Sequence, residues 1–190
     1  MQSNGFTDIQ LIKGCLSGKV KYQEMLYKRY FSFAMSICMR YAPNKEEAME
    51  ITNDSFMKAF DNLNDFDASK GFDRWFAKII INTAIDNYRK NFKHNTLTDT
   101  GDIPETDEDN QDIDQELSAN DIIELFAELP DTHRVVFNLY EIEGYTHEEI
   151  GKMLGMTTST SRSYLTRAKK ILRILYNKHF KTVYRYHEAF

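Results

Sequence analysis

The sequence predicts an all-α protein of two helical domains joined by an acidic, flexible linker. Apolar residues recur at helical spacing along most of the chain, and no stretch alternates between apolar and polar residues as a half-buried strand would. The segment between Asn95 and Ala119 breaks the pattern, since it has many acids, no Lys or Arg, and few large apolar residues. Because it cannot bury enough apolar surface to offset the entropy lost on ordering, we expect a tether there.

Single helices are expected on both sides of the tether. Before it, apolar periodicity covers residues 6–17, 21–41, 44–63 and 71–92. Pro43 ends the second helix, because a proline removes a backbone donor and pushes the residue before it out of the helical region. A polar loop that closes on Gly71 separates the third helix from the fourth. After the tether, Pro130 divides two further helices, at residues 121–129 and 131–143.

A helix-turn-helix follows these helices. Thr146 and Glu149 form a capping box at the start of its first helix, and Gly155 ends that helix. The second helix begins at about Thr158. Its inward stripe is expected to comprise Ser161, Tyr164, Leu165, Ala168, Ile171, Leu172 and Leu175. The turn between the helices is only a few residues long, as the DNA-reading motif requires.

Charge is sorted along the chain, although the formal net charge is -5. From Gly155 to His187 there is no Asp or Glu. The cations of this stretch are Arg162, Arg167, Lys169, Lys170, Arg173, Lys178, Lys181 and Arg185. Such a surface on a recognition-type helix suits a phosphate backbone, although the total charge argues against a protein that coats nucleic acid unaided.

Several other classes of protein are disfavoured. Cys15 and Cys38 are expected to be reduced core thiols, and they predict neither a metal site nor a disulfide. The histidines have neither metal-ligand spacing nor a nucleophile partner, so we expect no cofactor, no catalytic residue and no enzyme. We expect neither a signal peptide nor a membrane span, and therefore a cytoplasmic protein.

Five blocks of the sequence together match one known family: residues 27–30, 47–60 and 72–90 before the tether, and 129–140 and 143–150 after it. In these blocks the sequence resembles the extracytoplasmic-function (ECF) sigma factors of the bacterial sigma-70 family. The resemblance implies three parts: a promoter-melting region 2 domain at 1–94, the acidic linker at 95–118, and a helix-turn-helix region 4 domain at 119–190. It implies a transcription initiation factor that binds core RNA polymerase and recognises the −10 and −35 elements of promoter DNA. An anti-sigma factor, often membrane-bound in the family, is a further implied partner, without direct membrane insertion of this chain.

The resemblance implies that the third helix docks on core polymerase. Glu47, Glu50 and Asp54 fall on one helical face, and the family adds Asn53. On periodicity alone, a solvated acidic face explains these residues equally well. The chain departs from the family at Asn53, where Gln is usual, and at Met49, where an acid is usual.

By the same resemblance, the loop at 63–71 and the following helix capture a base flipped from the −10 element. The residues carried over are Phe66, Ser69, Lys70 and Asn82, with Arg89, Lys90 and Lys93 on phosphates. Phe66 could instead be a core residue that pins the loop, and the basic residues could complement the helix dipole. Trp75, Phe76, Ile79 and Ile80 are expected to be core.

The second helix of the motif is expected to read the −35 element in the major groove. Leu165, Ala168 and Leu172 should point inward, which turns Arg162, Ser163, Thr166 and Arg167 toward DNA. Thr158, Thr160, Lys169 and Lys170 should meet phosphates. Ser161 and Tyr164 depart from usual residues of such motifs, and Tyr164 could alter the −35 preference. A solvated basic helix end is the alternative.

Two other functions share some of these features. A free-standing helix-turn-helix regulator would bind a palindrome as a dimer, but it has no reason to contain the block at 72–90. An adaptor has no reason for a basic recognition helix. The linker is either an inert tether or an acidic strand that occupies nucleic-acid channels of polymerase until the transcript displaces it.

Overall fold

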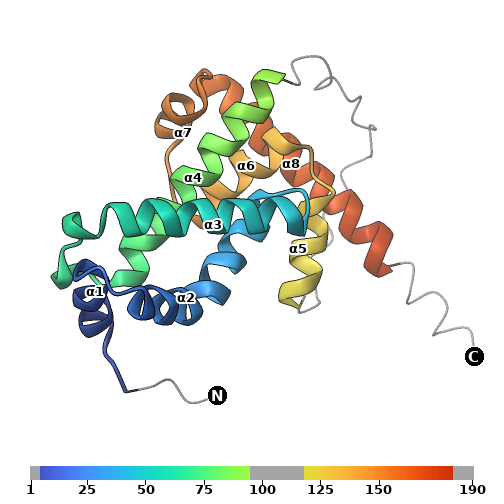
Figure 1. Ribbon diagram of the computed structural model, residues 1–190. Coiled ribbons are helices and arrows are strands. Elements are labelled where there is room, and N and C mark those ends of the chain that lie inside the picture. The colour runs from blue at the N-terminus through green and yellow to red at the C-terminus, as the bar shows by residue number, and fades with distance from the viewer. Residues whose placement is uncertain (1–4, 95–117, 182–190) are drawn as a thin grey trace, which may run out of the picture. The chain divides into compact units, whose positions relative to one another are not determined.

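The computed structural model describes residues 5–94 and 118–181, and within these ranges it consists of helices, turns and loops (Figure 1). The chain divides into two compact units, Met1–Tyr88 and Arg89–Phe190, with the boundary inside one long helix. Most of the linker predicted at 95–118 lies outside the described residues. The all-α prediction is confirmed for the described part of the chain.

The first unit is built from α1 (Asp8–Leu16), α2 (Val20–Tyr41), α3 (Lys45–Asp61) and α4 (Phe72–His94). These helices lie where the periodicity predicted them. Thr7 begins α1 with a capping box, and the Asn44 side chain accepts from the Glu47 amide at 2.8 Å to begin α3. The polar loop between α3 and α4 contains two short 3-10 turns, Leu63–Asp65 and Ala68–Lys70.

An aromatic cluster joins α2, α3 and α4 in the core of this unit. The ring of Phe56 lies 4.7 Å from that of Phe76, and the ring of Tyr30 lies 4.7 Å from that of Phe72. Phe56, Phe72 and Phe76 are almost completely buried. The cluster fixes the register of α3 and α4, and therefore decides which of their residues face solvent.

Two contacts hold α1 against α2. The carboxylate of Asp8 accepts from the Arg29 guanidinium and from the Tyr30 hydroxyl, each at 2.6 Å. A Cβ at Gly14 would come within 2.2 Å of the Tyr22 ring, so the helices approach closely only because this residue is glycine.

Both cysteines are buried free thiols, as predicted. Burial raises the pKa of Cys38 to about 11, so this thiol is protonated and inert at neutral pH.

The second unit contains α5 (Ala119–Ala127), α6 (Asp131–Phe137), α7 (His147–Leu154) and α8 (Thr158–Tyr176). Ser118 starts α5 with a capping box. A π-helical turn, Asn138–Ile142, continues α6, so the helix predicted at 131–143 is present but widens in its second half. A similar turn, Asn177–Lys181, follows α8. The long α8 packs against α5, α6 and α7.

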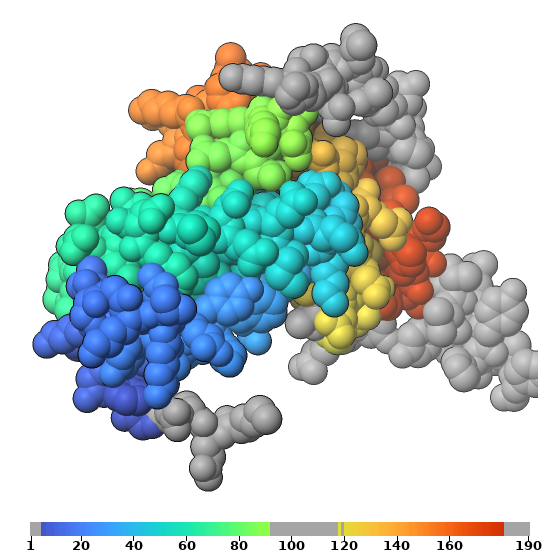
Figure 2. Space-filling model, viewed as in Figure 1, coloured from blue at the N-terminus to red at the C-terminus, as the bar shows by residue number. Residues whose placement is uncertain are grey.

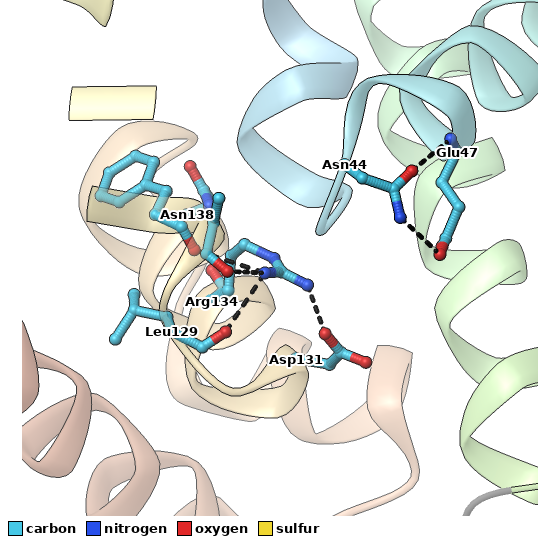
Figure 3. A network of polar contacts seen from close by, with 8 residues as sticks. Asn44, Glu47, Leu129, Asp131, Arg134 and Asn138 are labelled. Carbon is cyan, nitrogen blue, oxygen red and sulfur yellow. Dashed lines mark hydrogen bonds and ion pairs between the residues drawn. The ribbon is translucent and has the colours of Figure 1, made fainter. Parts of the chain in front are cut away.

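A buried arginine joins α5 to α6. The Arg134 side chain is 1% exposed. Its Nη1 donates to the carbonyls of Phe126 and Ala127 at 3.3 Å and of Leu129 at 3.1 Å, and Nη2 pairs with Asp131 (Figure 3). These carbonyls lie at the end of α5, where a helix has no internal donors left, so the cation serves as its C-terminal cap.

Candidate nucleic-acid and protein interfaces

The turn of the helix-turn-helix depends on two glycines. Gly155 has φ of 69° and so ends α7 in the left-handed region. Gly151 accepts from the Met156 amide at 3.0 Å, and a Cβ added at Gly151 would lie 2.7 Å from the Met156 carbonyl oxygen. The predicted capping box is present, since Thr146 and Glu149 exchange hydrogen bonds at 2.8 and 3.3 Å. The turn geometry therefore places the start of α8 tightly against α7.

A polar contact locks the two helices of the motif together. Ser161 is completely buried, and its hydroxyl lies 3.0 Å from Nδ1 of His147. The His147 ring stacks on Tyr140 with centroids 4.3 Å apart. Burial, and then the charge of Arg162, lower the pKa of His147, which favours the neutral imidazole. This contact explains why a small hydroxyl residue suits position 161.

Tyr164 lies on the inward stripe, as predicted, and the structure adds its partner in α6. Its ring packs edge-on against His133 with centroids 5.0 Å apart, and it is half-buried. Tyr164 therefore contributes to the packing of α8 against α6.

The exposed face of α8 carries the residues that were predicted to read bases. Arg162, Ser163, Thr166 and Arg167 are all exposed, while Leu165 and Ala168 are buried on the opposite side. The predicted inward stripe is less complete in the last turns, where Ile171, Leu172 and Leu175 are only half-buried and Tyr176 is buried. The Thr166 hydroxyl donates to the Arg162 carbonyl at 3.1 Å. This face therefore presents two guanidinium groups flanked by small hydroxyl side chains.

The predicted phosphate contacts differ in their surroundings. Nζ of Lys169 lies 2.7 Å from a carboxylate oxygen of Glu141, in the π-helical turn. Lys170 is half-buried, as is Thr158 at the first position of α8. The Thr160 hydroxyl lies 2.8 Å from that of Thr157, the N-cap. The positive charge of Lys169 is therefore partly neutralised within the unit itself.

The loop between α3 and α4 brings together some of the predicted −10 residues. Phe66 is half-buried, with its ring 5.7 Å from Phe72 and 5.5 Å from Trp75. Asp67 accepts from the Ser69 amide at 3.0 Å and from its hydroxyl at 2.8 Å, and lies 3.5 Å from Nζ of Lys70. The Ser69 hydrogen bonds lower the pKa of Asp67. Phe66 pins the loop, and Asp67 orders its tip.

Further −10 candidates lie along α4. Asn82 is exposed, as are Arg89 and Lys90. Of the residues predicted to be core, Phe76 and Ile80 are buried, and Trp75 and Ile79 are half-buried. The sequence reasoning missed Arg74 and Lys78, which are exposed and precede Asn82 at four-residue intervals. That spacing on one helical face was the available signal.

Helix α3, which carries the predicted docking residues, lies at the surface of the first unit (Figure 2). Glu50, Asn53 and Asp54 are exposed, and Glu47 is half-buried, accepting from the Asn44 side chain at 3.3 Å (Figure 3). The Tyr27 hydroxyl, from α2, donates to Oδ1 of Asn53 at 3.1 Å. This hydrogen bond uses Oδ1 of Asn53 and leaves its NH₂ group as the donor of the amide.

Within the described residues, no group of three or more His, Cys, Asp or Glu side chains could hold a metal ion. A search of the same residues for a helix long and apolar enough to span a bilayer finds none.

Comparisons with known proteins match both parts of the chain. The family model of sigma-70 region 2 matches residues 26–93, and that of sigma-70 region 4 matches residues 119–172. The RNA polymerase sigma factor SigV of Bacillus subtilis is 29% identical over 143 residues, which is 75% of this chain and 83% of that protein. The ECF RNA polymerase sigma-E factor of Haemophilus influenzae is 25% identical over 186 residues, covering 87% of this chain and 93% of that protein.

Solved structures show a weaker likeness. The sigma factor RpoE from Bartonella quintana, solved with the anti-sigma factor NepR, aligns with a TM-score of 0.47 and 18% identity, over 80% of this chain and 94% of that one. CnrH, solved with the cytosolic domain of CnrY, aligns with a TM-score of 0.44 and 18% identity, over 89% and 96%.

Proposed function

The chain belongs to the sigma-70 family as an ECF RNA polymerase sigma factor, and we infer that it is a transcription initiation factor that directs core RNA polymerase to promoters. The observation that carries this inference is the pair of family matches, region 2 before region 4. A free-standing helix-turn-helix regulator has no use for region 2. Sigma factors are not enzymes, so no chemistry of its own is proposed for this chain.

The exposed face of α8 is proposed to read the −35 element. Arg162 and Arg167 are the base-reading candidates, because a guanidinium can donate two parallel hydrogen bonds to a guanine edge in the major groove. Ser163 and Thr166 lie on the same face. Thr158, Thr160, Lys169 and Lys170 are proposed to meet phosphates, which position the helix without selecting sequence.

The loop at 63–71 and α4 are proposed to hold the −10 base. A flipped base needs polar groups for its edge, and Ser69, Lys70 and Asn82 are exposed and polar. Phe66 holds the loop against α4 by packing its ring on those of Phe72 and Trp75. Arg89 and Lys90 are proposed to contact phosphates.

The acidic face of α3 is proposed to dock on core polymerase. Glu47, Glu50, Asn53 and Asp54 form it, and a basic partner would complement its charge. An anti-sigma factor that competes for such faces is a further proposed partner. We propose a cytoplasmic location, since core polymerase is met there.

In-vitro transcription tests this function. Core polymerase with this protein should initiate from a defined subset of a genomic promoter library, and core polymerase alone should not. If the protein instead binds a palindromic DNA site without polymerase and stimulates no initiation, the proposal is wrong.

A further inference from the structure

The solvent face of α3 continues beyond its acids. Glu47, Glu50, Asp54, Met57 and Asp61 recur at alternating intervals of three and four residues, so they share one helical face. Met57 is 61% exposed. A large apolar side chain therefore lies in the open among carboxylates, directly along the proposed docking face.

The core prevents Met57 from turning inward. Its neighbours Phe56 and Ala59 are 2% and 1% exposed, and the Phe56 ring is wedged against Tyr27 and Phe76 at 4.5 and 4.7 Å. The register of α3 is thus set by the aromatic cluster. The exposure of Met57 is a consequence of the fold and leaves its thioether available to a partner.

An aromatic ring of α2 borders the same face. Tyr27 is half-buried, lies tilted against Phe31 with ring centroids 5.5 Å apart, and donates its hydroxyl to Asn53. Asn53 and Met57 are one helical turn apart. The surface around Met57 is therefore ordered before any partner arrives, which lowers the entropic cost of association.

The charged residues that share the helical face of Met57 are all acidic. Glu50 and Asp54 are exposed on its N-terminal side, and Asp61 is exposed on its C-terminal side. The adjacent cation, Lys58, lies 3.0 Å from Asp86 of α4. The face thus offers an apolar centre within an acidic rim, and its complement is a basic surface with an apolar socket.

We propose that Met57 is the apolar anchor of the contact with core RNA polymerase. This rests on the proposed function. Methionine and aromatic residues are enriched in the buried centres of interfaces, whereas Glu and Asp are depleted there and suit a solvated rim. Burial of Met57 supplies affinity, and the acids supply steering and salt dependence.

The test is the Kd between full-length protein and core polymerase at two salt concentrations. Met57→Ala should raise Kd about 10- to 100-fold, the range expected for losing a buried methionine, with the salt dependence unchanged. Met57→Gln, which keeps the length of the side chain, should weaken binding similarly, and Met57→Leu should restore it. Glu50→Gln with Asp54→Asn should weaken binding and flatten the salt dependence.

Val20→Ala is the matched control. Val20 is 72% exposed at the start of α2, outside the docking face, so its truncation should leave Kd unchanged. Thermal unfolding of each variant confirms that the fold is kept.

Two results would overturn the proposal and leave docking through α3 intact. In the first, the Met57→Ala variant binds core polymerase as tightly as the unmodified protein, while the acidic double variant binds more weakly. In the second, the Met57→Gln variant has the Kd of the unmodified protein. If the unmodified protein does not bind core polymerase at all, the proposed function itself fails.

Discussion

The ion pair between Lys169 and Glu141 predicts that Glu141 weakens the proposed contact between Lys169 and a DNA phosphate. The two groups are 2.7 Å apart, and their side chains are 53% and 33% exposed. A half-exposed pair of this kind contributes about 0–1 kcal/mol to folding. Glu141→Gln should therefore leave the stability nearly unchanged while it frees Lys169 for a phosphate.

The expected size follows from counterion release. Each additional phosphate contact adds about 0.9 to the slope of log affinity against log salt, so a fourfold salt increase costs about 3.5-fold more affinity per contact. Glu141→Gln should steepen the slope by up to about this amount and tighten binding at low salt. The preference among −35 sequences should stay the same, because phosphate contacts do not select bases.

The assay is holoenzyme affinity for promoter DNA across a salt series, with a set of single-base −35 variants. Removing a carboxylate also changes the net charge, so the matched comparison is Glu141→Gln in a Lys169→Ala background. If Glu141 acts through Lys169, its substitution has little effect there, which a double-mutant cycle measures. An unchanged slope in the single variant, or an equal effect in both backgrounds, would refute the reasoning.

Three further outcomes are expected. Gly151→Ala should destabilise the second unit by about 1–3 kcal/mol, because its Cβ would meet the Met156 carbonyl at 2.7 Å; a thermal melt unchanged from that of the unmodified protein would contradict this. Folding lowers the pKa of His147 from its ordinary value of 6.5. The stabilisation that depends on neutral His147 is therefore complete above pH 6.5 and is lost as the pH falls below that value. His147→Gln should remove that part of the pH dependence in denaturant titrations. Asp8→Ala should lower the free energy of unfolding by about 1–3 kcal/mol, since Arg29 and Tyr30 lose a shared acceptor. Hydrogen exchange should then show that α1 opens more readily. Equal protection of α1 in both proteins would show that Asp8 does not hold this helix.

Local signals predicted most of the fold. Pro43, Gly155 and the capping box of Thr146 act within a few residues of themselves, so the helix positions could be inferred from the sequence. The π-helical turn after Phe137 could not, because it depends on how α6 packs in the unit. The exposed side of α8 was predicted for the same local reason, since Leu165 and Ala168 mark the buried side.

Side-chain contacts between different helices could not be predicted from the sequence. Ser161 was recognised as a departure, but its partner His147 lies fourteen positions away on another helix. The ion pair of Lys169 with Glu141 likewise joins residues that lie far apart in the sequence, on different elements. Met57 continues the helical face of Glu50 and Asp54, but an apolar residue at helical spacing more often lies in a core, so its exposure could not be inferred from the sequence.

The buried guanidinium of Arg134 determines where the second unit can be separated from the rest of the chain. Three of its acceptors are carbonyls at the end of α5, so a fragment that starts at Pro130 keeps the cation and discards those acceptors. Stranding a buried charge in this way costs about 3–5 kcal/mol, a large share of the stability of a small domain. A fragment that keeps these acceptors must therefore include α5, and with it the N-cap Ser118 at which that helix begins.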